Sequence, residues 1–212
     1  MVEQGSAAWH AQRCGKVTAS KIADMMAKTR TGTAWGASRA NYAAMLIAER
    51  LTGCVAESYV SPAMEFGTAT EAEARSTYEF YTDSIVQPVG FIPHPTINMA
   101  GASPDGYVGT EGLIEIKVPN TATHIDTLLG QAVPARYIQQ IQWQLACTGR
   151  LWCDFISYDP RLPEEMRLFI RRVERNDTKI ADLTKEVIAF LAEIDAKVSQ
   201  LEKLYRLPMA AE

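Results

Sequence analysis

Two acidic residues and a lysine have the types and the spacing of a hydrolytic metal site. Asp105 follows Ser103-Pro104, and Glu115-Ile116-Lys117 begins ten residues after the aspartate. The triplet lies in an apolar segment that predicts a β-strand, on which residues two apart project from one face. Glu115 and Lys117 therefore project together, and the Gly106–Gly112 stretch predicts a hairpin that brings Asp105 close to Glu115. Two carboxylates bind a hard divalent cation through oxygen, and an adjacent lysine orients water or steadies developing charge, as cleavage of a phosphodiester requires.

The same residues also have a purely structural interpretation. Pro104-Asp105-Gly106 is a common turn tripeptide, and a strand with Glu and Lys on one face is an ordinary solvated strand. Other segments of the chain favour the chemical interpretation, because they supply the groups that such a site would still lack.

A third carboxylate, Glu71, lies on a predicted helix from Pro62 to Tyr81, where it shares a face with Arg75 and Tyr78. It would complete a site for two cations, in which one activates water and the other stabilises the leaving oxygen. The alternative is a surface ion pair between Glu71 and Arg75.

Uncharged polar side chains share one face of a second predicted helix, from Pro134 to Thr148. These are Tyr137, Gln140 and Gln144. Amides beside carboxylates can bond to phosphate or to the acids without changing the local charge. The alternative is a glutamine-rich face that points to solvent.

An arginine and hydroxyl groups precede a short predicted helix from Thr18 to Ala27, which Thr18 or Ser20 would cap. Arg13 just ahead of this helix start predicts a phosphate pocket. Trp9 fits either stacking on a DNA end or a place in the core.

The elements that must position these residues follow from hydrophobic periodicity and from Gly and Pro punctuation. Residues 28–37 form a polar loop and residues 121–133 a loop that allows one helical turn. Further helices are expected at Ser38–Leu51 and Asp177–Leu204, and strands at Val86–Ile92, Asn98–Ala100, Tyr107–Val108, Leu113–Val118, Trp152–Tyr158 and Met166–Val173. The Asp177–Leu204 helix is amphipathic and is expected to pack on its own sheet or on another subunit. This order predicts a single α/β domain over residues 1–212, with a mixed sheet flanked by helices.

Composition excludes few functions. The net charge is −4, from 21 Lys and Arg against 25 Asp and Glu, so no global basic field indicates a nucleic-acid partner. Basic residues concentrate locally, between Arg13 and Arg39 and between Arg161 and Arg175. No targeting signal and no membrane-spanning run is present, so we expect a cytoplasmic protein.

Cysteine and histidine offer little further chemistry. Cys14, Cys54, Cys147 and Cys153 lack a CxxC pair, which favours reduced thiols over an iron–sulfur cluster. His94 and His124 are expected to be structural or to face solvent.

Together these segments resemble, in order and near spacing, the lambda-exonuclease-like nucleases known as the YqaJ-like viral recombinases. The similarity covers about residues 8 to 195, but it is weak in the 121–135 loop. It rests on five blocks: Ala8–Ser20, Phe66–Phe80, Ser103–Gly106 with Gly112–Pro119, Tyr137–Gln142, and Tyr158–Arg161.

The resemblance implies a restriction-endonuclease-like core that carries the PD-(D/E)xK motif. It implies a Mg²⁺-dependent 5′-to-3′ exonuclease that degrades one strand of linear double-stranded DNA and leaves 3′ single-stranded overhangs for phage-type recombination. It also implies a homotrimeric ring around DNA, 5′-phosphate ends as the substrate, and a phage single-strand annealing protein as partner in a bacterial host.

The resemblance assigns roles to residues in two groups. Two Mg²⁺ ions are implied, for which Mn²⁺ is a substitute. Asp105, Glu115 and the Ile116 carbonyl would bind the first ion, and Asp105 and Glu71 would bind the second. Lys117 would position the attacking water, and Gln140 would lie beside the metals. Along the DNA the resemblance places Arg13, Ser20 and Ser103 at the 5′ phosphate, Arg30 near the strand entrance, and Trp9 and Tyr137 as further contacts.

Two other functions fit the same residues. An endonuclease of the same fold would cut closed circular DNA, which an exonuclease leaves intact. A non-catalytic DNA-end-binding protein would cut neither, but it would not need Glu71, Asp105, Glu115 and Lys117 together.

Overall fold

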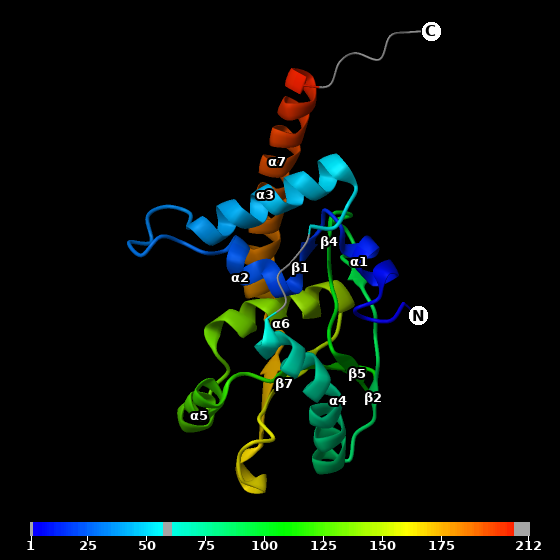
Figure 1. Ribbon diagram of the computed structural model, residues 1–212, viewed down its shortest axis with the longest axis vertical. Helices are drawn as coiled ribbons and strands as arrows, with labels where there is room; N and C mark the ends of the chain where they lie inside the picture. The colour runs from blue at the N-terminus through cyan, green and yellow to red at the C-terminus, as the bar shows by residue number, and fades with distance from the viewer. Residues whose placement is uncertain (1, 57–60, 206–212) are drawn as a thin grey trace.

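The computed structural model of the chain describes residues 2–56 and 61–205 (Figure 1). The elements in chain order are α1 Ala7–Arg13, β1 Val17–Thr18, the 3₁₀ turn η1 Ala19–Lys21, α2 Ile22–Met25, α3 Ala37–Thr52, α4 Pro62–Thr82, β2 Val86–Gln87, β3 Ile92–Pro93, β4 Ala100–Ala102, β5 Gly106–Val108, β6 Gly112–Lys117, α5 Thr121–Gly130, α6 Ala135–Thr148, β7 Trp152–Tyr158, the 3₁₀ turn η2 Glu164–Met166, β8 Leu168–Glu174 and α7 Asp177–Tyr205. This mixed α/β arrangement confirms the predicted fold class.

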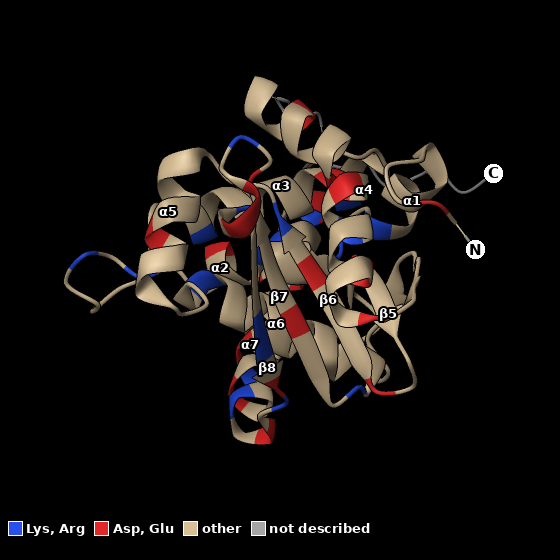
Figure 2. Cartoon of the chain, turned by 90° about the horizontal axis from the view of Figure 1, so that it is seen from below, with Lys and Arg blue, Asp and Glu red and all other residues tan. Residues whose placement is uncertain are grey.

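A five-stranded sheet carries the predicted catalytic strand. Its order is β2-β5-β6-β7-β8, with β6 and β7 parallel and the other neighbours antiparallel. Figure 2 shows β5, β6, β7 and β8 side by side. The parallel pair needs a long crossover, which α5 and α6 supply between the two strands. Glu115 lies opposite Phe155 in this pair, at the centre of the sheet.

A second, three-stranded sheet has the order β1-β4-β3. The single strand expected at Val86–Ile92 is wrong, because β2 belongs to the five-stranded sheet and β3 to this one. Pro88 lies between them, where its missing N–H prevents a continuous ladder. Gly90 is buried where an added Cβ would lie 2.5 Å from the Val2 carbonyl oxygen, so the chain there packs against the N-terminal segment.

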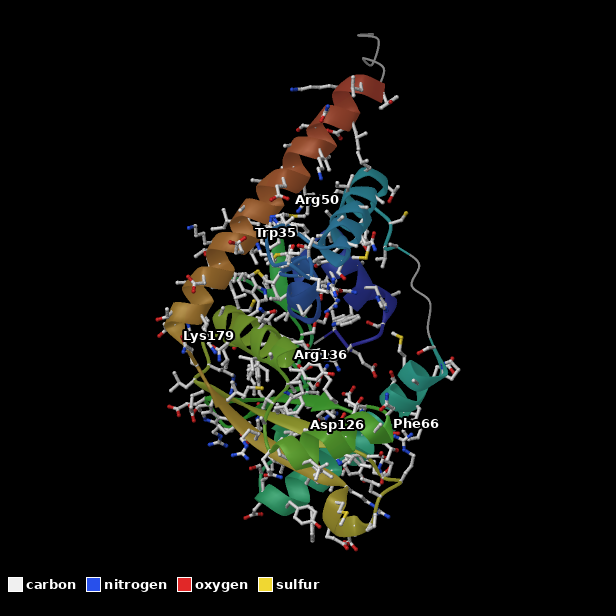
Figure 3. All side chains as sticks on the ribbon, turned by 90° about the vertical axis from the view of Figure 1, so that its left-hand side faces the viewer. Trp35, Arg50, Phe66, Asp126, Arg136 and Lys179 are labelled. Carbon is white, nitrogen blue, oxygen red and sulfur yellow. The ribbon has the colours of Figure 1, made fainter. Side chains whose placement is uncertain are left out.

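Helix α6 occupies the centre of the molecule. It contacts α2, α7 and the strands β3, β4 and β7, and Figure 3 shows it between the helices α2, α3 and α7 and the five-stranded sheet. Every residue from Gln140 to Cys147 on this helix is buried, including Trp143. The glutamines of α6 therefore do not form the solvent-facing surface that was the alternative interpretation.

Helix α7 packs on its own chain along a buried stripe that includes Ile180, Leu183, Val187, Phe190 and Ile194. Its contacts are with α3 and α6, with Phe190 stacked on Tyr42 at 5.7 Å between ring centroids. The helix thus covers other helices of its own chain, whereas the sheet was the partner expected within the chain. Its C-terminal turns extend beyond the body of the molecule (Figure 1).

Two local expectations are wrong. Residues 121–130 form a full helix, α5, because Asn120 caps it by accepting from the Thr123 N–H at 2.9 Å and because His124 and Thr127 are buried. The helix expected from Thr18 instead starts with the 3₁₀ turn η1, and the Thr18 side chain makes no capping hydrogen bond. Thr18 ends β1, where its N–H donates to the Tyr42 hydroxyl at 3.1 Å.

None of the helices within the described residues has the length and apolarity to cross a bilayer.

Candidate active site

The β5–β6 hairpin holds Asp105 against the strand that carries Glu115 and Lys117. The Asp105 N–H donates to the Ile114 carbonyl at 3.2 Å, and the Asp105 Oδ2 accepts from the Ile116 N–H at 2.6 Å. The turn residue is thus bonded through its backbone and its side chain to β6. The hairpin expected from the sequence is present, and it fixes the aspartate beside the glutamate.

Glu115 is the most enclosed acid of the group, with an exposed fraction of 1%. Its Oε1 accepts from Lys117 Nζ and from Gln140 Nε2, each at 2.5 Å, and its Oε2 accepts from Gln144 Nε2 at 2.5 Å. A carboxylate buried in this way needs such donors, because an unpaired buried charge is costly. Two glutamines one helical turn apart on α6 therefore hold the orientation of this acid.

Lys117 lies at the rim of the site, with its Nζ 5.4 Å from the centre of the Tyr137 ring. Burial by itself lowers the pKa of Lys117, but the negative charges of Glu115 and Asp105 outweigh it and raise that pKa above its usual value. These negative charges favour the ammonium form of the side chain, which can donate hydrogen bonds to a water or to a phosphate oxygen.

Asp105 lies within electrostatic reach of both Glu115 and Glu71. Burial raises the pKa of Asp105 well above its usual value, and the charges of Glu115 and Glu71 raise it further. Glu71, on α4, pairs with Arg75 at 2.8 Å, so the i,i+4 pair considered from the sequence is present. Negative charge thus accumulates around Asp105, and a bound cation would neutralise it.

The acids contact protein donors: Asp105 contacts the Ile116 N–H, Glu115 contacts Lys117 and two glutamines, and Glu71 contacts Arg75. Across the described ranges, no three His, Cys, Asp or Glu side chains converge into a ready-made metal centre. The donor set nevertheless suits a hard divalent cation, because it consists of carboxylate oxygens; burial, followed by the charges of Glu115 and Glu71, raises the pKa of Asp105 among them. The residues present therefore fit Mg²⁺.

An open pocket of about 420 Å³ adjoins this cluster. Its walls come from the N-terminal half of α4 and from the end of β6, and they include Met64, Gly67, Glu71, Lys117 and Pro119. Glu71 and Lys117 thus border a space that a substrate can enter.

A second polar group lies two residues before Asp105. Ser103 Oγ accepts from Arg13 at 3.0 Å and from the Trp9 indole N–H at 3.0 Å. The Arg13 guanidinium also lies 4.0 Å from the centre of the Trp9 ring. Burial lowers the pKa of Arg13, an effect that Tyr42 and Glu49 oppose. Trp9 is half-buried on α1, so its ring is held in place by Arg13 and Ser103 and is not part of the buried core.

Residues that the sequence argument missed anchor this second group. Glu49, buried near the end of α3, accepts from the Gly15 N–H at 2.6 Å, and Arg50 donates to the Gly15 carbonyl at 2.9 Å. Gln4 donates to the Pro104 carbonyl at 2.8 Å. These side chains tie the segment of Arg13 to α3 and the N-terminus to the turn of Asp105. Only long-range hydrogen bonds reveal them, and no local pattern predicts such partners.

Other expected site residues lie further from the carboxylates. Arg30 is exposed on the polar loop between α2 and α3, which protrudes from the body (Figure 1). Ser20 is exposed on η1, and none of the described hydrogen bonds joins it to Arg13 or Ser103. Tyr137 is half-buried, with its ring 5.3 Å from that of Phe155 and its hydroxyl accepting from Arg136. The DNA-binding roles of these residues remain predictions.

His94 and His124 are packed into the fold. His94 stacks on Trp143 with 4.9 Å between ring centroids, and buried His124 contacts Ser157 Oγ at 2.7 Å and the Met166 carbonyl at 2.9 Å. Of the two expected placements, structural or facing solvent, both histidines take the structural one. All four cysteines are free thiols, of which Cys147 and Cys153 are buried.

Comparison with known proteins identifies relatives. The model of the YqaJ-like viral recombinase domain matches residues 8–151. The alkaline exonuclease LHK-Exo from Laribacter hongkongensis is 51% identical, with a TM-score of 0.87 over 93% of this chain and 97% of that chain. The same enzyme in complex with dAMP gives 52% identity, a TM-score of 0.88 and the same coverage.

A phage-related exonuclease from Haemophilus somnus 129PT shares the fold, with 15% identity and a TM-score of 0.71 over 88% of this chain and 96% of that chain. Curated protein sequences give no match. The family model covers most of the chain and includes Arg13, Glu71, Asp105, Glu115 and Lys117. The chain therefore belongs to the YqaJ-like viral recombinase family and is a nuclease with a restriction-endonuclease-like fold.

Proposed function

We propose that this nuclease is a Mg²⁺-dependent 5′-to-3′ exonuclease, which degrades one strand of linear double-stranded DNA and leaves 3′ single-stranded overhangs. The observation that carries the proposal is the adjacency of two groups. Asp105, Glu115 and Lys117 lie at the β5–β6 hairpin. Ser103, which accepts a hydrogen bond from Arg13, is only two residues before Asp105 in the chain. The relative LHK-Exo is an alkaline exonuclease, and its complex with dAMP contains a nucleoside monophosphate, the kind of product that exonucleolytic cleavage releases.

The acids divide between two cation positions in this proposal. Asp105, Glu115 and the Ile116 carbonyl would hold one Mg²⁺, and Asp105 with Glu71 would hold a second. Bound there, the two cations would activate water and stabilise negative charge on the phosphate oxygens, and Mn²⁺ suits the same oxygen ligands.

Protein groups supply orientation and charge around the scissile phosphate. Lys117 remains protonated and orients the attacking water by donating a hydrogen bond, while Gln140 keeps Glu115 in place. The pocket beside α4 and β6 gives the terminal nucleotide a place next to Glu71 and Lys117. Charged donors fixed in advance stabilise the transition state more than mobile ones do, because they need not reorganise during the reaction.

Arg13 and Ser103 form the element that selects the end of the strand, with Ser20 as a further hydroxyl donor. A guanidinium and a hydroxyl bind a terminal phosphate through charge-assisted hydrogen bonds. Each cut exposes a new 5′ phosphate, which would enter the same pocket and place the next phosphodiester at the acids. The DNA would continue past Trp9, Arg30 and Tyr137.

The decisive experiment is digestion of linear duplex DNA that carries a 5′ phosphate on one strand only, with Mg²⁺ or with EDTA. We expect Mg²⁺-dependent loss of the phosphorylated strand, while a closed circle of the same sequence stays intact. Cutting of the circle would replace the proposal with an endonuclease. No cleavage of either DNA would leave a DNA-binding protein.

Arg13→Ala tests the pocket in the same assay. We expect the preference for 5′-phosphorylated over 5′-hydroxyl ends to fall to nearly equal rates, because both ends then lack a cationic partner. Arg171→Ala, which removes an exposed arginine on β8, should retain the preference. A preference in Arg13→Ala equal to that of the unmodified protein would rule out the pocket. The ratio of rates is used because it does not depend on a general loss of activity.

A further inference from the structure

The two oxygens of the Glu115 carboxylate have unequal partners. Oε1 accepts from Lys117 and from Gln140, whereas Gln144 is the donor to Oε2. Lys117 and Gln140 share one oxygen, so either can be lost without leaving that oxygen unpartnered. Gln144 has no such substitute among the described hydrogen bonds to Oε2.

Gln144 is fully buried on α6, with an exposed fraction of 0%. A carboxylate only accepts, so the amide nitrogen must face Glu115, and the amide oxygen, Oε1, is directed elsewhere. This Oε1 is buried and has no hydrogen-bond partner in the described structure. An unsatisfied buried polar atom costs about 1–3 kcal/mol, which a leucine of similar volume would avoid. The fold therefore retains this amide at a cost, beside Glu115.

A second buried amide on the same helix shows what a purely structural glutamine looks like. Gln142 donates to the Glu174 carbonyl at 2.8 Å and accepts from the Asn176 N–H at 2.8 Å. Both of its polar atoms are satisfied by the backbone that joins β8 to α7. Gln144 differs in having one partner, and that partner is an acid of the site.

We propose that Gln144 is a positioning residue, which fixes the rotation of the Glu115 carboxylate so that Glu115 and Asp105 present a constant pair of ligands to a divalent cation. The proposal rests on the proposed function, in which Glu115 binds that cation. A hydrogen bond to Oε2 stops the carboxylate from rotating about its Cγ–Cδ bond, so less conformational entropy is lost when the cation binds. Gln144 touches neither the cation nor the DNA in this role.

The test is Mn²⁺ binding to the DNA-free protein by calorimetry, with Gln144→Met and the matched variant Gln142→Met. Both substitutions replace a buried amide of α6 with an apolar side chain of similar length. We expect Gln144→Met to raise the Mn²⁺ dissociation constant by roughly 10- to 100-fold, as loss of a ligand's supporting hydrogen bond typically does. Gln142→Met should lower the thermal stability but leave the dissociation constant within about twofold. Gln144→Asn, which withdraws the donor by one methylene, provides a second variant in case Gln144→Met does not fold.

Digestion kinetics add a second measurement that a merely structural role would not change selectively. In Gln144→Met the Mg²⁺ concentration for half-maximal rate should rise, while the KM for DNA stays constant. Equal Mn²⁺ affinities in the unmodified protein and a folded Gln144 variant would overturn the proposal. An equal loss of affinity in Gln142→Met would also overturn it, because the effect would then be general damage to α6.

Glu115→Gln separates this proposal from the one on which it rests. If Glu115→Gln loses Mn²⁺ binding but the Gln144 variants do not, only the positioning role fails. If Glu115→Gln binds Mn²⁺ as the unmodified protein does, Glu115 is not a ligand and the proposed metal site fails together with it.

Discussion

The metal-binding role proposed for Asp105 conflicts with the stability of the fold. Burial and the charges of Glu115 and Glu71 raise its pKa, so its ionised form is disfavoured in the folded protein. When the pKa of an acid is higher in the folded than in the unfolded state, the stability of the protein falls as the pH rises from the unfolded-state pKa to the folded-state pKa. Above the folded-state pKa the loss of stability is constant. Without a cation, the ionised Asp105 therefore destabilises the fold at neutral pH.

Asp105→Asn should raise the thermal midpoint of the metal-free protein in EDTA at neutral pH. Asparagine can still accept from the Ile116 N–H but carries no charge. We expect a gain of about 2–4 °C, which corresponds to ~1 kcal/mol for a chain of this size. The gain should shrink toward acidic pH, where Asp105 of the unmodified protein is protonated. Addition of Mn²⁺ should stabilise the unmodified protein and not the variant, as measured by thermal denaturation. A variant less stable than the unmodified protein in EDTA at neutral pH would contradict the charge argument.

Residue types and their spacing in sequence predicted the cluster of Asp105, Glu115 and Lys117 because local geometry places these residues. Alternation on β6 sets the direction of Glu115 and Lys117, and the hairpin sets the position of Asp105. The i,i+4 spacing on α6 placed Gln140 and Gln144 on one face, although a role was assigned to Gln140 alone. The contacts of Glu49 and Gln4 were not predictable, since each joins segments that are distant in the chain and no periodicity encodes such a pair.

At the scale of elements, the start of β6 depends on the close approach of the Trp152 ring to the backbone at Gly112. A Cβ at Gly112 would lie 2.1 Å from an atom of the Trp152 ring. That ring cannot move freely, because the Arg172 guanidinium lies 3.5 Å from its centre and is itself held by Asp154. The register that brings Glu115 opposite Phe155 begins at this pair.

Gly112→Ala should therefore destabilise the protein by roughly 1–3 kcal/mol, the range for overpacking in a well-packed region. Gly130→Ala at the end of α5 is the control, since its added Cβ would meet no atom within 4 Å. We expect that substitution to be neutral or slightly stabilising. Urea denaturation of both variants measures the difference. Equal midpoints would show that the Trp152 ring moves aside without loss of stability.

Long periodic elements were predictable, and short ones were not. The bounds of α3, α4, α6, β7 and α7 agree within two residues with the sequence patterns, because each has many residues on one buried face. Strands of two or three residues, such as β2 and β3, carry no period, and their assignment to different sheets depends on tertiary pairing. The helix α5 was missed because its threonines have low intrinsic helix propensity and its stability comes from the Asn120 cap and the burial of His124.

At the scale of the whole molecule, charge is distributed in a way that composition hides. The net charge of −4 neither indicates nor excludes a DNA partner. Figure 2 shows Lys and Arg interspersed with Asp and Glu along the ribbon in that view. An assembly that encloses DNA would retain it by geometry, and such retention would respond weakly to salt.

We propose that the chain assembles as a homotrimeric ring around its DNA, the arrangement that its similarity to the lambda-exonuclease-like family implies, and that a phage single-strand annealing protein is its partner on the exposed strand. Native mass spectrometry should then give three times the chain mass of 23.4 kDa.

A ring also predicts that digestion of a long, 5′-phosphorylated duplex continues after an excess of unlabelled duplex ends is added, because the enclosed strand cannot be exchanged. Raising the salt after digestion has begun should slow it much less than raising the salt before the DNA is added. A monomeric mass at working concentration, or digestion that stops when the competitor is added, would rule out the ring. Either result would leave the proposed cleavage chemistry at Asp105 and Glu115 unaffected.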